Sequence, residues 1–251
     1  MLKEQRCDLI LSELRKKSIV AIEEITALTK SSRSTICRDI DELEAKQLLR
    51  RIRGGIACYE TETSFKIRQD LQLDEKMRIA AAARKMVSSN DTLFLNCGTT
   101  VYELAKTLGD VPATLYVATN DLKSATVLAE YGNVSLTVLG GTLRQAHYSL
   151  NGYFTDYMIS QMHADIVFLG VDAVDFNLGY MNFCTEELNT SKLMLQSAQK
   201  SVVLCDHTKF DRIAFVSICK MQEIDLLITG KEISREHLDR LRQMGIQVMT
   251  V

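Results

Sequence analysis

A regular alternation of short apolar runs with helix-like segments begins near Glu75 and constrains the fold more than any other feature of the sequence. The apolar runs are nearly continuous, as in strands that are covered on both faces of a sheet. The expected strands lie in TLFLNCGTT, TLYVATN, VSLTVLGG, ADIVFLGVD, SVVLCD, DLLITG and IQVMTV, and the expected helices occupy residues 76–87, 101–108, 121–131, 153–162, 185–200 and 233–244. Strands that alternate with helices predict an α/β domain with a mostly parallel sheet.

The first 58 residues follow a different pattern. Apolar residues at helical spacing predict three helices. Their apolar positions are Leu9, Ile10 and Leu14, then Ile22, Ile25 and Leu28, and then Ile36, Ile40 and Leu43. Ser31 and Ser32 are capping residues before the third helix, which should run to about Lys46. LLRRIRGGIACY, with its Gly-Gly turn, predicts a β-hairpin. Three helices followed by a hairpin predict a winged helix-turn-helix.

Residues 60–75 are polar and show little apolar periodicity, so they are the best candidate for a linker. We therefore expect a winged helix-turn-helix domain over 1–58, a linker over 59–74 and a larger α/β domain over 75–251.

A DNA-binding function must rest on a local basic patch, because the formal net charge of the chain is −2. Residues 30–55 hold seven Lys and Arg against four Asp and Glu. In a helix-turn-helix the second helix of the motif enters the major groove, where hydroxyls suit phosphates and arginine pairs with guanine. The candidate DNA contacts are Ser32, Arg33, Ser34, Thr35, Cys37 and Arg38 of the third helix and Arg51 and Arg53 of the hairpin. Taken by itself, the third helix fits a capped surface helix as well as it fits a DNA-binding helix. The order of three helices followed by a Gly-Gly hairpin favours the DNA-binding interpretation.

The N-terminal part resembles the DNA-binding domain of the DeoR family of bacterial transcriptional repressors. The resemblance is carried by Arg6, Ile10, Leu14, Ser32, Thr35, Ile36, Arg38, Asp39 and Ile40 and by RRIRGG. It implies that Asp39 supports the helix and orients basic groups instead of touching DNA. The chain departs from the family at Cys37, where relatives carry a second arginine, and at Gln47, where they carry glycine. The first departure predicts a changed operator preference or fewer phosphate contacts.

Small polar and charged residues follow several expected strands of the C-terminal part. In an open α/β sheet, ligands bind at the carboxyl ends of the strands. The candidate ligand contacts are Asn96, Gly98, Thr99, Thr100, Thr119, Asn120, Gly141, Asp172, Glu186, Lys192, Asp206 and Lys209. Carboxylates that accept sugar hydroxyls and lysines that neutralise phosphate suit a phosphorylated sugar. Singly, each residue could instead be a helix cap or part of a surface ion pair. No Walker or GxGxxG motif indicates a nucleotide.

The elements GTT, TN, GGTLR, GVD, the pair Glu186-Glu187 with Lys192, and DHTKF resemble the effector-binding domain of the same family. The resemblance implies a Rossmann-like fold similar to that of ribose-5-phosphate isomerase. It also implies that this domain binds a sugar phosphate and relays its presence to the DNA-binding domain. Asn96 and Asp206-His207-Thr208 depart from the family pattern and leave the identity of the sugar open.

Seven cysteines without a CxxC pair predict free thiols in a reducing compartment, with neither a disulfide framework nor a metal site. Cys97 could be a reactive thiol or, as the more ordinary interpretation, a buried filler. His147, His163 and His237 lack metal-ligand spacing and are expected to be surface residues or to be satisfied within the fold. No apolar run is long enough to span a bilayer, and the acidic start argues against a signal peptide, so we expect a cytoplasmic protein.

The sequence therefore predicts a transcriptional regulator, a repressor of a sugar-catabolism operon, whose operator binding is modulated by a phosphorylated sugar. Its expected partners are operator DNA, a sugar-phosphate effector and further copies of itself in a dimer or tetramer, with no membrane and no cofactor. It is not expected to be an enzyme. Two alternatives stay open: a sugar-phosphate isomerase or deaminase that carries a DNA-binding domain, with Asp172 and Glu186 as candidate bases, and a nonspecific DNA-binding protein without an effector.

Overall fold

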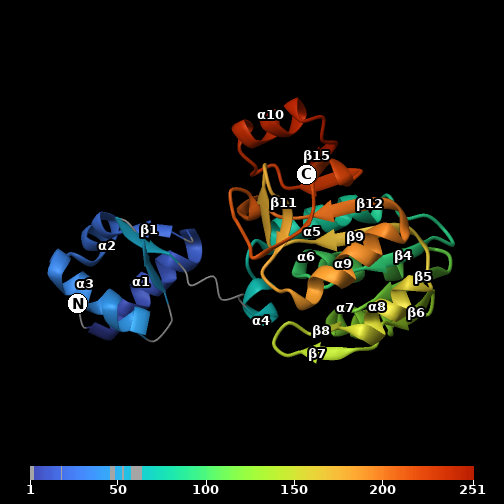
Figure 1. Cartoon of the computed structure of the whole chain (residues 1–251), viewed down its shortest axis with the longest axis horizontal. Helices are drawn as coiled ribbons and strands as arrows, with labels where there is room; N and C mark the ends of the chain where they lie inside the picture. The colour runs from blue at the N-terminus through green and yellow to red at the C-terminus, as the bar shows by residue number, and fades with distance from the viewer. Residues whose placement is uncertain (1–2, 18, 46–48, 53, 58–63) are drawn as a thin grey trace. The chain divides into compact units, whose positions relative to one another are not determined.

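The computed structural model describes residues 3–17, 19–45, 49–52, 54–57 and 64–251. The chain divides into two compact units, Met1–Thr63 and Ser64–Val251 (Figure 1). Part of the predicted linker is structured: α4 (Phe65–Arg68) and the start of α5 lie within it, and the Phe65 side chain is buried. Phe65 is an apolar anchor in an otherwise polar stretch. The domain limits 1–58 and 75–251 remain a prediction.

The first unit has the winged helix-turn-helix fold that the sequence predicts. Its elements are α1 (Lys3–Lys17), β1 (Ile19–Ala21), α2 (Ile22–Thr29), α3 (Arg33–Ala45), β2 (Arg50–Ile52) and β3 (Gly55–Ala57). The strands form an antiparallel sheet in the order β1-β3-β2. The predicted hairpin is β2 and β3, whereas β1 is too short to leave a periodic signal.

The core of the first unit is built from the predicted apolar stripes, with two exceptions. Leu9 is only partly buried and does not belong to this core. Leu28 was expected on the buried face of α2, but it is 45% exposed, and Thr29 is buried in its place. Ile22, Ile25 and Thr29 are spaced by three and four residues and share one helix face, whereas Leu28 falls off that face. The Thr29 hydroxyl donates to the Ile25 carbonyl at 2.8 Å, which satisfies the buried polar group.

Backbone conformation and close packing explain why the hairpin carries glycine at both positions 54 and 55. Gly54 has φ +84°, a left-handed conformation that favours glycine. A Cβ on Gly55 would lie 2.5 Å from the Val20 carbonyl oxygen of β1. The Gly-Gly sequence therefore permits both the turn and the close approach of the third strand.

The second unit is an α/β domain with a seven-stranded sheet. Its strands are β4 (Thr92–Leu95), β5 (Leu115–Thr119), β6 (Val134–Val138), β9 (Ala164–Gly170), β12 (Ala198–Leu204), β14 (Leu226–Thr229) and β15 (Val248–Thr250). They lie in the order β15-β14-β12-β9-β4-β5-β6, and every neighbouring pair is parallel. The parallel sheet predicted from the apolar runs is confirmed.

Six helices accompany this sheet. They are α5 (Leu73–Arg84), α6 (Thr99–Ala105), α7 (Leu122–Leu128), α8 (Tyr153–Ser160), α9 (Glu186–Gln196) and α10 (Arg235–Gln243) (Figure 1). Alternate residues of β9 face two different cores: Ile166 and Phe168 belong to the core with α5, α6 and α7, and Val167 and Leu169 to the core with α8, α9 and α10. The helix predicted over 185–200 ends at Gln196, because Ala198 begins β12.

Several short elements were not predicted because they are too short or too polar for a periodic signal. They are the hairpin β7 (Thr142–Arg144) and β8 (Ser149–Asn151), the small sheet β10 (Ala173–Asp175), β11 (Gly179–Asn182) and β13 (Val216–Cys219), and the 3-10 turns Leu108–Asp110, His207–Lys209 and Met221–Glu223. The chain runs from β4 outward to β5 and β6 on one side, and from β9 outward to β12, β14 and β15 on the other. The adjacent strands β4 and β9 therefore flank the switch point of the sheet, where a crevice is expected.

A buried lysine on α5 makes the stability of this domain depend on pH. Lys76 is 2% exposed, its Nζ donates to the Arg68 carbonyl, and burial lowers the pKa of Lys76 from 10.5 to about 8. Between these two values the unfolded chain binds a proton that the folded chain does not, so the stability of the folded state rises with pH.

We therefore predict that, relative to a Lys76→Met variant, the free energy of unfolding of the native protein rises by about 2 kcal/mol between pH 7.5 and 9.5. Urea unfolding of both proteins at the two pH values measures this change. If the difference in the free energy of unfolding between the native protein and Lys76→Met is the same at both pH values, Lys76 titrates normally and the prediction is wrong.

Candidate functional site

The start of α3 presents a cluster of hydroxyl groups. Lys30 ends α2 in a left-handed conformation, with φ 51°, and Ser32 then caps α3. The Thr35 backbone N–H donates to Ser32 Oγ at 3.2 Å, and the hydroxyls of Ser34 and Thr35 both lie 2.9 Å from that oxygen. Because Ser32 and Ser34 are exposed, this cluster is accessible to a phosphate backbone.

The arginines predicted to contact DNA differ in their partners. Arg33 pairs with Glu23 at 2.7 Å, and Arg51 pairs with Asp41 at 2.8 Å. Arg38 is exposed and, among the described residues, makes no hydrogen bond or ion pair. Arg53 lies outside the described residues. Arg38 is therefore the predicted contact whose guanidinium is free to bind a base or a phosphate.

Asp39 is turned away from this surface. It is 3% exposed, and its carboxylate accepts two hydrogen bonds from Arg6, from Nε at 2.8 Å and from Nη2 at 3.2 Å. This paired contact fixes α3 against α1, consistent with the supporting role that the family resemblance implies for Asp39.

Cys37 lies half-buried on α3, and its backbone carbonyl accepts a hydrogen bond from Arg51 Nη2 at 3.3 Å. We predict that Cys37→Arg strengthens or redirects DNA binding, because it adds a long cationic donor beside Arg38. Binding to a randomised operator library should change, and the salt dependence should steepen by about one released counterion. An unchanged operator profile would show that this position does not face DNA.

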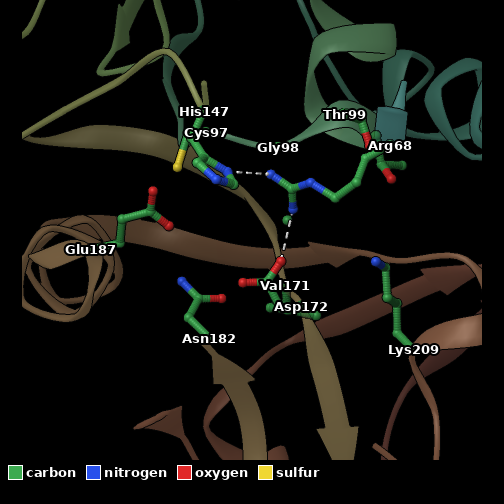
Figure 2. A pocket seen from close by; sticks show the side chains of 12 residues that line it. Arg68, Cys97, Gly98, Thr99, His147, Val171, Asp172, Asn182, Glu187 and Lys209 are labelled. Carbon is green, nitrogen blue, oxygen red and sulfur yellow. Dashed lines mark hydrogen bonds and ion pairs between the residues drawn. The ribbon is translucent and has the colours of Figure 1, made fainter. Parts of the chain in front are cut away.

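The second unit holds a pocket at the switch point between β4 and β9 (Figure 2). It is lined by Arg68, Cys97, Gly98, Thr99, Thr100, His147, Gly170, Val171, Asp172, Asn182, Glu187 and Lys209. The segments after β4, β9 and β12 supply the predicted residues Gly98, Thr99, Thr100, Asp172 and Lys209.

The other predicted ligand contacts do not line this pocket. Asn96 is 1% exposed and joins the ends of β4 and β9, donating to the Gly170 carbonyl at 3.1 Å and accepting from its N–H at 2.7 Å. Asn120 donates to the Leu150 carbonyl at 3.1 Å, and Thr119 Oγ1 accepts from the Asp121 N–H at 3.1 Å. The side chains of Asn96 and Thr119 and the amide nitrogen of Asn120 are therefore used by the fold, whereas Asn120 Oδ1 is buried without a hydrogen-bond partner among the described residues.

The remaining predicted contacts have structural or surface positions. A Cβ on Gly141 would lie 2.2 Å from Thr155 Oγ1, so this glycine permits close packing. Asp206 is buried and accepts from the Thr208 N–H at 3.0 Å. Glu186 and Lys192 are exposed on α9. A strand end or helix start alone could not distinguish these roles from ligand binding.

Five lining residues with functional side chains were not predicted as contacts: Arg68, Cys97, His147, Asn182 and Glu187. Only Glu187 left a usable signal. It is buried with Thr190, Ser191 and Met194, which follow it by three, four and seven residues, so this spacing marks the inner face of α9. His147, expected on the surface or satisfied in the fold, is buried and bound to Arg68.

Two acids and two arginines fix the electrostatics of the pocket. Arg68 Nη1 pairs with Asp172 Oδ1 at 2.8 Å, and Arg144 Nη1 pairs with Glu187 Oε1 at 2.9 Å. Burial and the nearby Arg144 and Arg68 lower the pKa of His147 to about 4. The imidazole is therefore neutral at pH 7, and its Nδ1 can accept the hydrogen bond from Arg68 Nη2 at 3.2 Å.

Cys97 is not activated. Burial, the Glu187 carboxylate and the Asp121 carboxylate raise the pKa of the Cys97 thiol well above its ordinary value. The group is a thiol at neutral pH, which favours the interpretation of Cys97 as a filler over that of a reactive nucleophile.

Several polar groups of the pocket are not used by the fold. Within the described part of the chain, the Thr99 and Thr100 hydroxyls, the Asn182 amide and the Lys209 ammonium make no hydrogen bond or ion pair. An ammonium with hydroxyl donors suits a phosphate, and a carboxylate such as that of Asp172 suits sugar hydroxyls.

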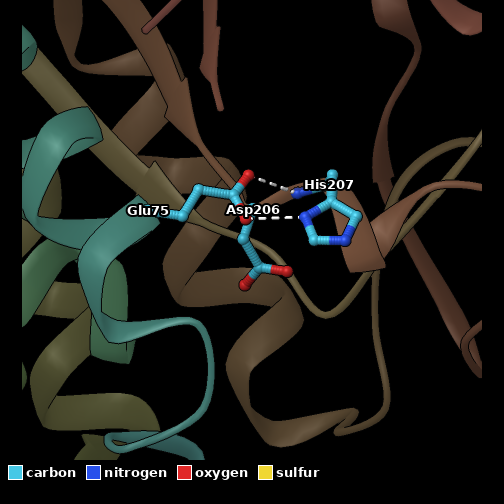
Figure 3. Close-up of side chains that lie close together, drawn as sticks. All are labelled: Glu75, Asp206 and His207. Atoms are coloured by element: carbon cyan, nitrogen blue, oxygen red, sulfur yellow. Dashed lines mark hydrogen bonds and ion pairs between the residues drawn. The ribbon is translucent and has the colours of Figure 1, made fainter. Parts of the chain in front are cut away.

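Glu75, Asp206 and His207 form a cluster with metal-ligand chemistry beside this pocket (Figure 3). Glu75 Oε1 accepts a hydrogen bond from the His207 N–H at 2.8 Å, Glu75 Oε2 lies 2.6 Å from His207 Nδ1, and Asp206 Oδ1 accepts a hydrogen bond from the Thr208 N–H at 3.0 Å. The contact between Glu75 and His207 therefore fixes the Lys209 turn against α5.

A winged helix-turn-helix with an exposed arginine on α3, joined in one chain to an α/β domain with a polar crevice, defines the class of ligand-responsive DNA-binding regulators. Residues 6–62 match the model of the DeoR-like helix-turn-helix domain, and residues 71–231 match that of the DeoR C-terminal sensor domain. The chain belongs to the DeoR family. It is a DNA-binding transcriptional regulator, and its C-terminal part is a sensor domain of the kind that binds sugar phosphates.

Curated relatives are similar along their whole length. The HTH-type transcriptional repressor GlcR of Bacillus subtilis (strain 168) is 29% identical, with 99% of this chain and 96% of the relative covered. The HTH-type transcriptional regulator GolR of Listeria innocua is 29% identical, with 97% of each covered. The glycerol-3-phosphate regulon repressor of Escherichia coli (strain K12) is 29% identical, with 91% of each covered. These relatives are regulators, not enzymes, as predicted for this chain.

Among solved structures, ribose 5-phosphate isomerase A from Methanocaldococcus jannaschii aligns with a TM-score of 0.41 and 19% identity. The alignment covers 55% of this chain and 54% of that enzyme chain. Within the described residues, no helix is long and apolar enough to cross a membrane.

Proposed function

We propose that α3 and the β2–β3 hairpin recognise operator DNA, with Arg38 as the leading base or phosphate contact. The proposed contacts are Ser32, Arg33, Ser34, Thr35, Cys37, Arg38, Arg51 and Arg53. The support for this assignment is the free Arg38 guanidinium on a helix that Ser32 caps and Asp39 anchors. Arg33 and Arg51 must leave Glu23 and Asp41 to bind a phosphate, so their net contribution is smaller.

The effector is a phosphorylated sugar held at the β4–β9 crevice. Lys209 and the hydroxyls of Thr99 and Thr100 bind the phosphate, and Asp172 and Asn182 bind sugar hydroxyls. One observation carries this assignment: a lysine and two threonines whose side chains make no hydrogen bond or ion pair among the described residues line the same crevice as a buried carboxylate. Asn96, Thr119, Asn120, Gly141, Glu186, Lys192 and Asp206 are left out because the fold uses them or exposes them elsewhere.

The regulator works as a homo-oligomer, a dimer or a tetramer, because helix-turn-helix proteins bind two half-sites with two recognition helices. The regulated genes belong to sugar catabolism, by analogy with the sugar operons that relatives control. Binding of the effector shifts the equilibrium between an arrangement that binds the operator and one that binds it weakly.

Calorimetry on the full chain with a panel of sugar phosphates, their unphosphorylated sugars and inorganic phosphate tests the effector. At least one sugar phosphate should bind more tightly than either of its parts, since the phosphate and the hydroxyls have separate partners. A parallel assay for isomerised or deaminated product should detect none. If no compound of the panel binds, the effector assignment is wrong. If an isomerised or deaminated product forms, the alternative function as a sugar-phosphate isomerase or deaminase is favoured.

A further inference from the structure

Arg68 is a charged pocket residue to which the proposed function gives no role. It is the last residue of α4, and its guanidinium reaches into the pocket between Asp172 and His147 (Figure 2). Its side chain is 18% exposed, and its Nε is buried without a hydrogen-bond partner. A half-buried guanidinium whose Nε has no hydrogen-bond partner among the described residues can gain bonds from an anionic ligand.

The contacts of α4 show what such a ligand would disturb. Phe65 packs edge-on against Tyr102 and Tyr148, with ring centroids 5.4 and 5.9 Å apart, and its N–H donates to the Ala146 carbonyl at 2.9 Å. Lys76 Nζ donates to the carbonyl of Arg68. A helix of one turn has little stability of its own, so these contacts and the Arg68–Asp172 pair hold it in place.

The loop that carries His147 is itself strained. Ala146 and Tyr148, on either side of His147, both have φ 62°, a left-handed conformation that is unfavourable for residues with a Cβ. The same loop therefore presents the Ala146 carbonyl to Phe65 and the His147 ring to Arg68. Its conformation and the docking of α4 are maintained together.

We propose that the Arg68–Asp172 ion pair is a latch through which pocket occupancy controls the docking of α4. The proposal rests on the proposed sugar-phosphate site. A phosphate carries more negative charge than the Asp172 carboxylate and offers more oxygens, so it attracts the guanidinium away from Asp172. Asp172, once released, accepts a sugar hydroxyl. A sugar without phosphate cannot open this latch, which makes the response specific for phosphorylated ligands.

The position of α4 in the chain, directly after the N-terminal unit, explains how the latch would affect the DNA-binding domain. Phe65 begins α4 two residues after Thr63, the last residue of the N-terminal unit. A change in the docking of α4 therefore alters how the chain leaves the sensor domain toward the DNA-binding domain. Arg68 is thus both a ligand contact and the residue that couples the ligand to the operator.

Hydrogen–deuterium exchange of the full chain over residues 64–72 tests the latch. A sugar phosphate that binds by calorimetry should speed exchange of this segment several-fold, while the matching unphosphorylated sugar should not. Asp172→Asn and Arg68→Gln should each give the fast exchange without ligand, and the double variant should be no faster, since both remove one interaction. Lys66→Met is the matched control, because Lys66 is an exposed cation of the same helix.

The outcomes separate the two proposals. If a sugar phosphate binds but exchange over 64–72 is unchanged or slower, the latch is wrong and the effector site stands. If both single variants exchange as slowly as the native protein, the ion pair does not hold α4, and the latch is again wrong. If no sugar phosphate binds, the effector site fails, and the latch fails with it.

Discussion

Replacing Arg38 with alanine should lower the affinity for operator DNA by about 10- to 100-fold, the loss of one paired arginine contact to a base. Arg38 has the largest expected effect because its guanidinium makes no ion pair among the described residues and loses none on binding. Anisotropy of a labelled promoter fragment at fixed salt measures the loss. Sugar-phosphate binding should be unchanged, because the effector site lies entirely in the other unit.

Arg235→Ala is the control for Arg38→Ala. Arg235 is an exposed arginine on α10 of the sensor domain, so its removal changes the net charge equally without touching α3. Operator affinity should stay within about twofold of the native value. If both variants lose affinity alike, net charge and not α3 determines binding. Loss of sugar-phosphate binding in Arg38→Ala would contradict the separation of the two sites.

Lys209→Met should weaken sugar-phosphate binding by about 10- to 100-fold, as expected for the loss of a hydrogen bond between charged groups. Lys209 lies on the turn after β12, and the contact between Glu75 and His207 holds that turn in place. Methionine keeps an unbranched side chain that is one atom shorter and removes the ammonium group with its charge and its hydrogen-bond donors. Calorimetry with the tightest sugar phosphate of the panel measures the effect, and the unphosphorylated sugar should be insensitive to the substitution.

Lys192→Met tests whether Lys192 contacts the ligand, as the sequence predicted, or lies outside the ligand site, as its position in the structure indicates. Both lysines were predicted as ligand contacts, but Lys192 is exposed on α9 and does not line the pocket. Sugar-phosphate affinity should therefore be unaffected by Lys192→Met. A loss equal to that of Lys209→Met would place the ligand outside the β4–β9 crevice.

The fold could be predicted because its signals are local and periodic. Continuous apolar runs such as ADIVFLG identify strands covered on both faces, and Ser32 and the Gly54-Gly55 pair mark a helix start and a turn. The elements that escaped prediction, β1, α4 and the β7–β8 hairpin, have only three or four residues in each helix or strand. Their conformation is set by tertiary contacts, such as those of Phe65 with Tyr102 and Tyr148.

The pocket could be predicted only in part. Gly98, Thr99, Thr100, Asp172 and Lys209 follow strands that end at the switch point, so the rule for open α/β sheets locates them. The same rule selected residues such as Asn96 and Asp206, which satisfy buried backbone or turn groups instead. Arg68 was missed because a residue 104 positions from Asp172 in a polar stretch carries no local signal of a pairing in space.

The central claim is that a phosphorylated sugar controls specific DNA binding by this chain. The most direct measurement is the anisotropy of a labelled fragment from its own promoter, titrated with the full chain at fixed salt, with and without each sugar phosphate. The account predicts binding at least about 1,000-fold tighter than to unrelated DNA, and at least one sugar phosphate that changes this affinity about fivefold or more. Equal affinity for promoter and unrelated DNA, with no response to any sugar phosphate, would contradict it.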